Sequence, residues 1–136
     1  MKELTVDAVV ENIPIVTDFV NEQLMPHDCS IKIQAQIDIA IDELFGNIAH
    51  YAYDPDVGSA TVRVELVKEP LTVVITFIDH GVPYNPLKQD EPDTTLLAEE
   101  RKIGGLGIYM VKKSMDNIYY EYKDGQNILT IKKKLY

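Results

Sequence analysis

The feature that most constrains the fold is a run of apolar residues near the middle of the chain. Residues 71–79, LTVVITFID, are rich in β-branched side chains and are almost continuously apolar. A segment of this kind favours a central strand that is covered on one face and paired along both edges. We therefore expect a sheet that is built around residues 71–79.

Four further segments predict the other strands of this sheet. Residues 3–10 alternate partly between apolar and polar side chains, and residues 60–67, ATVRVELV, alternate cleanly. Toward the C-terminus, the segments 117–123 and 127–135 flank the turn DGQ, which predicts a hairpin.

Three segments have the periodicity of helices. The first begins near Pro14 and ends before Pro26, the second has Ser30 as its cap, and the third follows the glycines of residues 104–107. The order of the elements predicts an α/β two-layer sandwich, in which a mixed, mostly antiparallel sheet carries about three helices on one face. The expected core face of the second helix consists of Ile33, Ile37, Ala40, Leu44 and Ile48.

Length and composition restrict the function classes. With 136 residues, of which 46% are hydrophobic, the chain suits a single domain over residues 1–136 and is too short for two ordinary ones. The formal net charge of −9 argues against nonspecific binding to nucleic acid. Cys29 is the only cysteine, which excludes an intrachain disulfide and a zinc site built from cysteines.

The sequence does not predict membrane attachment. The longest apolar stretch is far shorter than a membrane span, and residues 1–14 carry acids where a signal peptide has a basic region. Lysines 132–134 can attract a membrane surface, although lysines at a strand end more often discourage pairing of the sheet edge. We expect a cytoplasmic protein with neither a nucleic-acid nor a membrane partner.

One stripe of the second helix is polar. Glu43, Asn47 and His50 share one face of an α-helix because they are four and three residues apart. The carboxylate of Glu43 can orient or deprotonate a hydroxyl, and the amide oxygen of Asn47 suits Mg²⁺. The alternatives are a solvated polar stripe and, for His50, a cap or surface position.

The predicted central strand ends at a carboxylate. Asp79 can accept a hydrogen bond from an exocyclic amine such as that of adenine, and Gly81 lets the backbone approach a flat ring. An Asp-Gly turn at a strand end is the alternative.

A glycine cluster precedes the third helix. Gly104, Gly105 and Gly107 stand where unpaired amides and the helix dipole favour phosphate oxygens, although they match neither a P-loop nor a dinucleotide fingerprint. Arg101, just upstream, can neutralise a terminal phosphate from a lid loop over about residues 87–103. The alternatives are a glycine hinge and a solvated cation.

Together these motifs predict a nucleotide pocket, and at this point the sequence resembles the GHKL ATPases, the superfamily of gyrase B, the histidine kinases and the mismatch-repair ATPases. DELFGNIAHYAY resembles the Asn-containing helix motif, DHGVPYNP the Asp-x-Gly motif, and GGLGIYMVKK the second glycine motif. Within the superfamily, the chain is most similar to the bacterial anti-sigma serine/threonine-protein kinases.

The resemblance implies a role for each motif. Asn47 would ligate Mg²⁺, Glu43 would be the base for the incoming hydroxyl, and Asp79 would bind the adenine amine, with Gly81 beneath the ring. The cofactors would be ATP and Mg. The phosphates would be contacted by Gly105, Gly107 and Arg101.

One position departs from the pattern of the superfamily. Many relatives have a threonine near the end of the sheet that supports the aspartate through a water molecule. Both Asn127 and Thr130 stand near that place in this chain, and the sequence does not decide between them.

The leading hypothesis is an Mg-ATP-binding regulator that phosphorylates a serine or threonine of an anti-anti-sigma factor and sequesters a sigma factor. The resemblance also allows for a homodimer. The alternatives are a nucleotide-gated protein-binding module without phosphoryl transfer and the catalytic half of a histidine kinase.

Overall fold

A computed structural model describes residues 1–88 and 105–136 of the chain. Its five strands form one sheet in the order β1-β2-β3-β5-β4, and all four pairings between the described strands are antiparallel. The predicted sheet is therefore confirmed. It was expected to be mixed, but the described strands contain no parallel pair. The strands are β1 (Lys2–Asp7), β2 (Ser59–Val67), β3 (Thr72–Asp79), β4 (Asn117–Lys123) and β5 (Gln126–Lys134).

The apolar segment 71–79 forms the central strand, as predicted. β3 pairs with β2 along one edge and with β5 along the other. Its side chains Val73, Ile75 and Phe77 are buried and alternate with more exposed ones, so they project from the same face of the sheet.

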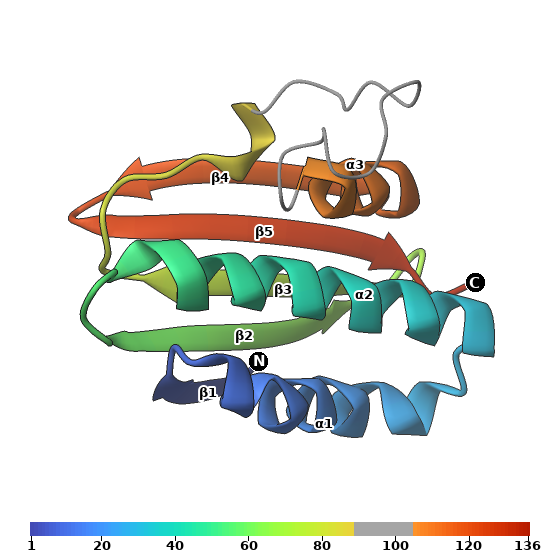
Figure 1. Cartoon of the computed structure of the whole chain (residues 1–136). Helices are drawn as coiled ribbons and strands as arrows, with labels where there is room; N and C mark the ends of the chain where they lie inside the picture. The colour runs from blue at the N-terminus through green and yellow to red at the C-terminus, as the bar shows by residue number, and fades with distance from the viewer. Residues whose placement is uncertain (89–104) are drawn as a thin grey trace.

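The helices α1 (Ile13–Leu24), α2 (Ile31–Asn47) and α3 (Gly105–Ser114) lie on one face of the sheet, as Figure 1 shows. The Oγ atom of Ser30 accepts a hydrogen bond of 3.2 Å from the backbone N–H of Ile33, which confirms Ser30 as the cap of α2. The structure is therefore the two-layer sandwich that the sequence predicts.

The core lies between the helices and the sheet. Ile37, Ala40 and Leu44 are buried as predicted, and Ile33 and Ile48 pack against the core while partly exposed. The buried face of α2 is wider than the predicted stripe and includes Ile41 and Phe45. α2 contacts α1 on one side and α3 on the other, so more of its circumference is covered than a single apolar stripe indicates.

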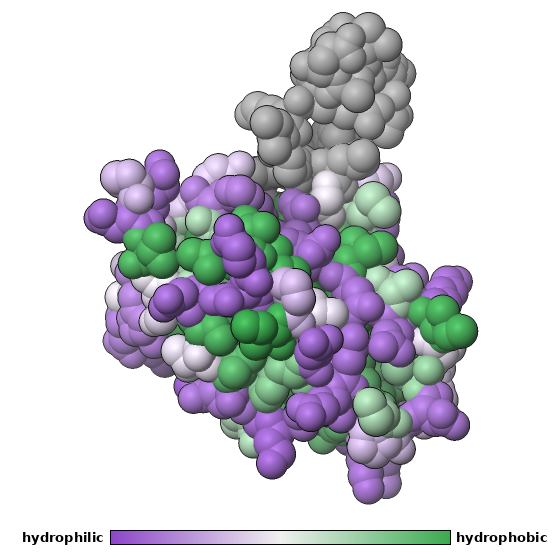
Figure 2. Space-filling model, turned by 60° about the horizontal axis from the view of Figure 1, so that its bottom comes forward, coloured by the Kyte–Doolittle hydropathy of each residue, from purple (hydrophilic) through white to green (hydrophobic). Residues whose placement is uncertain are grey.

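The surface that carries α1 and β1 is mostly polar, with apolar side chains gathered between the charged ones (Figure 2). Ile15 and Ile39 belong to the exposed apolar residues of α1 and α2. Among the described residues, none of the helices combines the length and the apolar character that a membrane crossing requires.

β5 pairs with β4 through a tight hairpin and with β3 on its other edge, and both pairings position the start of β5. Asp124 and Gly125 form its two-residue turn, and both have positive φ angles, of 54° and 75°. In the adjoining pair of β3 with β5, Asp79 lies directly opposite Asn127. The end of the central strand and the start of β5 are thus held side by side.

Candidate active site

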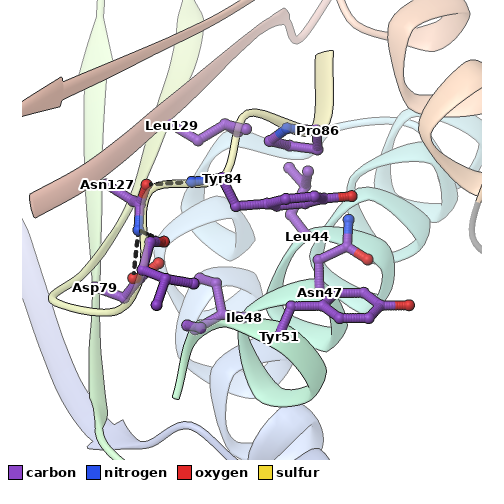
Figure 3. A pocket seen from close by; sticks show the side chains of 11 residues that line it. Leu44, Asn47, Ile48, Tyr51, Asp79, Tyr84, Pro86, Asn127 and Leu129 are labelled. Carbon is purple, nitrogen blue, oxygen red and sulfur yellow. Dashed lines mark hydrogen bonds between the residues drawn. The ribbon is translucent and has the colours of Figure 1, made fainter. Parts of the chain in front are cut away.

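A pocket opens between the C-terminal end of α2, the end of β3 and the start of β5, and Figure 3 shows the side chains that line it. Asn47 contributes to the wall formed by α2, while Asp79 and Asn127 come from the sheet. The cavity volume is about 40 Å³. The remaining lining residues are Leu44, Ile48, Tyr51, Ala52, Val82, Tyr84, Pro86 and Leu129.

The helix that carries Asn47 changes its winding at this residue. α2 ends at Asn47 and continues as the π-helical turn η3 (Ile48–Ala52). A π turn holds more residues than an α turn, so His50 leaves the stripe of Glu43 and Asn47. His50 is exposed and does not line the pocket, which agrees with the surface position given above as its alternative.

Asp79 is held by two hydrogen bonds at the sheet side of the pocket. Its side chain is 4% exposed, and its Oδ1 atom accepts from the Nδ2 atom of Asn127 at 2.9 Å and from the backbone N–H of Gly81 at 2.8 Å. The carboxylate is therefore oriented by the strand pairing and by its own turn.

The same geometry distinguishes between Asn127 and Thr130. Thr130 lies opposite Thr76 in the strand pairing and is not part of the pocket lining, whereas Asn127 contacts Asp79 directly. The side chain beside Asp79 is therefore that of Asn127, and it contacts the carboxylate without an intervening water molecule.

The turn after β3 packs tightly against the end of η3. A methyl group at Gly81 would overlap the backbone carbonyl of Ala52, and the N–H of Val82 donates to the same carbonyl at 2.9 Å. Gly81 thus has a packing reason for lacking a side chain. Val82, rather than Gly81, lines the pocket, so a position of Gly81 beneath a base stays a prediction.

Glu43 lies one helical turn before Asn47 and faces the first turn of α3. A methyl group at Gly107 would overlap the carboxylate of Glu43, which places the two residues in direct contact. Burial, with a smaller contribution from the charge of Asp42, raises the pKa of Glu43. The carboxylate therefore binds a proton more tightly than an exposed glutamate does.

Two polar atoms on this part of α2 are buried without a protein partner. The Oε1 atom of Glu43 and the Nδ2 atom of Asn47 make no hydrogen bond within residues 1–88 and 105–136. Buried polar atoms are normally paired, so an unpaired acid and amide one turn apart fit a site that a polar ligand completes. The carboxylate and amide oxygens of this pair can also ligate Mg²⁺, and the carboxylate can accept a hydrogen bond from a hydroxyl.

Three tyrosines near the pocket were not predicted. Tyr51 and Tyr84 form a ring pair with centroids 5.7 Å apart. The hydroxyl of Tyr53 donates to the carbonyl of Ser59 at 2.6 Å and accepts from the N–H of His80 at 2.8 Å. The cluster of aromatic residues at 51–53 was a usable signal, but the fold of the segment at 84 was not readable from sequence.

The remaining predicted residues lie at or beyond the limits of the described chain. Arg101, Gly104 and the lid segment from residue 89 onward are outside the described residues. Gly105 is the first residue of α3, and residues 86–88 form the short helix η4. The structure thus brings Asn47 and Asp79 to one pocket and Glu43 to Gly107 beside it.

Comparison with known protein families gives a match over most of the chain. Residues 6–133 match the family described as histidine kinase-like ATPase domain. The chain is 32% identical over 98 residues to "Serine-protein kinase RsbW" of Bacillus mycoides, and it is 24% identical over 102 residues to "Serine/threonine-protein kinase BtrW" of Bordetella bronchiseptica. The first alignment covers 69% of this chain and 60% of the relative, and the second covers 75% and 71%.

Solved structures show the same fold at low sequence identity. The RsbU and RsbW domains of Rv1364c from Mycobacterium tuberculosis superpose with a TM-score of 0.66 at 18% identity, over 99% of this chain and 33% of that one. The histidine kinase AdeS of Acinetobacter baumannii gives 0.56 at 16% identity, over 99% and 68%. The two structures show the fold, and the family match over residues 6–133 establishes that the chain belongs to the histidine kinase-like ATPase domain family.

Proposed function

We propose that the protein binds Mg-ATP and transfers the terminal phosphoryl group to a serine or threonine hydroxyl of a protein partner. The observation that carries the proposal is the pair of unpaired buried atoms, Glu43 Oε1 and Asn47 Nδ2, one helical turn apart and beside the pocket of Asp79. Kinase names among the relatives support the same reaction class.

Each described residue has a role that follows from its position. Asp79 would accept a hydrogen bond from the adenine amine, and the amide oxygen of Asn47 would bind Mg²⁺. When it is bound, the metal would neutralise phosphate charge. The first turn of α3 at Gly107 would offer backbone N–H groups to the phosphates. Arg101, Gly104 and Gly105 remain predicted phosphate contacts.

Glu43 is the proposed base for the incoming hydroxyl. Its raised pKa makes it a stronger proton acceptor than an exposed carboxylate, and its Oε1 atom has no competing donor among the described residues. Phosphoryl transfer depends mainly on positioning the reacting groups and neutralising the phosphate charge. A single oriented carboxylate is therefore sufficient to accept the proton of the hydroxyl.

The pocket has to widen for a nucleotide to enter. The cavity volume of about 40 Å³ lies well below the roughly 300–1,000 Å³ that is typical of small-molecule pockets. Tyr51 and Tyr84 both line the pocket, and their ring centroids lie 5.7 Å apart. The proposal therefore includes a rearrangement of this ring pair when ATP binds.

The proposed partners come from the resemblance to the bacterial anti-sigma serine/threonine-protein kinases. By analogy with the anti-sigma kinases, the phosphate acceptor would be an anti-anti-sigma factor, and a sigma factor would be the sequestered protein. A homodimer is part of the same analogy. The chain spans 60% of the length of the RsbW kinase that it matches, so the acceptor and the sequestered protein are both to be identified by experiment.

The test is a labelling assay in which the acceptor is a small protein that is encoded next to this one in the genome. Radiolabelled ATP with Mg²⁺ should label the acceptor, and Glu43→Ala should abolish labelling while calorimetry still detects ATP binding. Labelling that survives the substitution would remove Glu43 from the mechanism. If ATP changes the affinity for the acceptor without any labelling, the protein is a nucleotide-gated binding module. A wild-type protein that binds no ATP would overturn the proposal.

A further inference from the structure

Lys112, on α3, holds the backbone of the short helix η4. Its Nζ atom donates a hydrogen bond of 3.0 Å to the carbonyl of Leu87. The other hydrogen bonds of η4 within the described residues are local, because the N–H groups of Leu87 and Lys88 both donate to Asn85, at 2.9 and 3.2 Å. These local bonds shape the turn but do not determine where it lies. Lys112 therefore supplies the hydrogen bond that fixes η4 against α3.

The carbonyl that Lys112 holds is next to a wall of the pocket. Pro86 is buried and lines the pocket of Asn47 and Asp79, as Figure 3 shows. Consecutive Cα atoms are only about 3.8 Å apart, so a hydrogen bond at Leu87 restrains the position of Pro86. Lys112 does not line the pocket itself, and its effect on this wall is therefore indirect.

The same helix borders the side of the site where phosphates are proposed to bind. Gly107, in the first turn of α3, contacts the carboxylate of Glu43. Lys112 follows Gly107 by five residues, which corresponds to about 7.5 Å along the axis of a continuous helix. One end of α3 is thus placed against Glu43, and a side chain near its other end is bonded to the segment that carries Pro86.

The neighbouring lysine makes a different contact. Lys113 is exposed, and its Nζ atom lies 5.3 Å from the ring centroid of Tyr109 on the same helix, whereas Lys112 is half-buried. Both lysines belong to the last turn of α3 and carry the same charge. Lys113 therefore offers a matched control that has the charge of Lys112 without its hydrogen bond to η4.

We infer that Lys112 is a positioning residue that sets the distance between the base side and the phosphate side of the nucleotide site, through its hydrogen bond to the carbonyl of Leu87. The inference rests on the proposed binding of ATP and adds a residue that touches no nucleotide itself. A ligand that bridges both sides benefits from a fixed distance, because less ordering of the protein is then needed on binding. A ligand that occupies one side alone does not depend on this distance.

The experiment compares ATP with its two halves. Dissociation constants for ATP, adenosine and tripolyphosphate are measured with Mg²⁺ on the full chain, by calorimetry for ATP and by NMR titration for the halves. Lys112→Met keeps an unbranched side chain and removes the donor. The variant should bind ATP about tenfold more weakly, as expected for the loss of a hydrogen bond from a charged donor, and its affinity for either half should change by less than about twofold.

Two further variants separate the hydrogen bond from the charge. Lys112→Arg keeps a charged donor and should bind ATP within about threefold of wild type. Lys113→Met removes the same charge from the adjacent position and should leave the affinities for ATP and for both halves unchanged. A role of Lys112 in stability alone would weaken all three ligands in proportion to the unfolded fraction.

The outcomes distinguish the inference from the proposed function. Wild-type protein that binds neither ATP nor either half would overturn both. If wild type binds ATP and Lys112→Met weakens adenosine or tripolyphosphate as much as ATP, Lys112 acts on one side of the site alone and the inference is wrong. Unchanged ATP binding in Lys112→Met, or an equal loss in Lys113→Met, would also overturn the inference alone.

NMR of the unaltered protein gives a second test that needs no substitution. Tripolyphosphate with Mg²⁺, which occupies only the phosphate side, should shift the backbone amide signals of Leu87 and Lys88 on the base side. The amide signals of β1, at the far edge of the sheet, should not change. If tripolyphosphate binds and the signals of Leu87 and Lys88 do not move, the inference is overturned.

Discussion

Gly107, in the first turn of α3, lies directly against the carboxylate of Glu43 on α2. An ideal Cβ atom at Gly107 would overlap the Oε2 atom and the carboxyl carbon of Glu43. Two residues 64 positions apart in the sequence are therefore in contact beside the pocket of Asn47 and Asp79. The contact joins the proposed base to the helix that would meet the phosphates.

Gly107→Ala should impair phosphoryl transfer more than folding. The three atoms nearest to the added methyl group all belong to the carboxylate of Glu43, the far end of a flexible side chain that can move away at little cost in stability. Alanine also has a higher helix propensity than glycine, by up to about 1 kcal/mol. We expect an unfolding free energy within about 1 kcal/mol of wild type and at least a tenfold loss of labelling, since a small displacement of a catalytic group has effects of this order.

Gly46→Ala is the matched control for this substitution. Gly46 also lies in a helix next to the site, but a Cβ atom there meets nothing within 4 Å among the described residues. The variant should gain up to about 1 kcal/mol in unfolding free energy from helix propensity and keep its labelling rate. Equal activity losses in Gly46→Ala and Gly107→Ala would contradict a specific contact with Glu43.

The pKa shift of Glu43 predicts a pH-dependent stability difference. Burial raises its pKa in the folded state, so Glu43 favours folding below its unfolded pKa, and this contribution is lost as the pH rises through the folded pKa. Glu43→Gln removes the ionisation. The variant should melt a few degrees higher than wild type at about pH 8, and the difference should shrink toward about pH 5.

The measurement is thermal unfolding of both proteins across this pH range without nucleotide. Glu43→Gln should lose labelling at every pH, because the amide cannot accept the hydroxyl proton. A variant that is less stable than wild type at about pH 8 would indicate that the carboxylate has a favourable partner in the folded protein.

Gly81→Ala should be strongly destabilising, in contrast to Gly107→Ala. Its methyl group would overlap the backbone carbonyl of Ala52, which cannot move without shifting η3 and the turn together. Overpacking of this kind costs about 1–3 kcal/mol. Urea unfolding should show a loss in this range, and ATP affinity should fall because Val82 and Asp79 lie on either side of Gly81. Wild-type stability in this variant would show that the turn is not tightly packed.

Tyr53→Phe should destabilise the end of the central strand. The hydroxyl joins the carbonyl of Ser59 at the start of β2 to the N–H of His80 just after β3. Deleting it leaves two backbone groups without this partner and should cost about 1–2 kcal/mol in unfolding free energy. Tyr122→Phe, on an exposed ring of β4, is the control and should change the free energy by less than about 0.5 kcal/mol. Equal changes in the two variants would contradict the bridging role.

Asn47 should be required for stabilisation by Mg-ATP. Free ligand at about 100 times its Kd should stabilise the fold by about 2.7 kcal/mol, which corresponds to a rise in Tm on the order of 10 °C. Removing Mg²⁺ with a chelator should abolish most of this rise in Tm. The substitution Asn47→Ala should have the same effect. Asn117→Ala should leave it intact. A full rise without Mg²⁺ would argue against a metal at Asn47.

Much of the fold was readable from sequence because its signals are local. The run at 71–79 is almost continuously apolar and rich in β-branched residues, which favours a central strand, and β3 is that strand. Ser30 and the Asp124–Gly125 turn were readable for the same reason, since a cap and a two-residue turn depend on a few neighbouring residues.

Parts of the candidate site were not readable, because they depend on contacts between distant segments. The predicted stripe assumed a continuous α-helix, but residues after Asn47 form a π-helical turn and His50 is exposed. The place of Asn127 depends on the register of β3 with β5, which a sequence motif does not encode.

The sequence by itself determined the order of the elements, the central strand and the Ser30 cap of α2, because periodicity and turn chemistry act over a few residues. Only the tertiary structure decided that Glu43 contacts Gly107, that Asn127 rather than Thr130 holds Asp79, and that Gly81 is needed against Ala52. These relationships arise from close packing and strand register, where a shift of one residue or one methyl group changes which side chains meet.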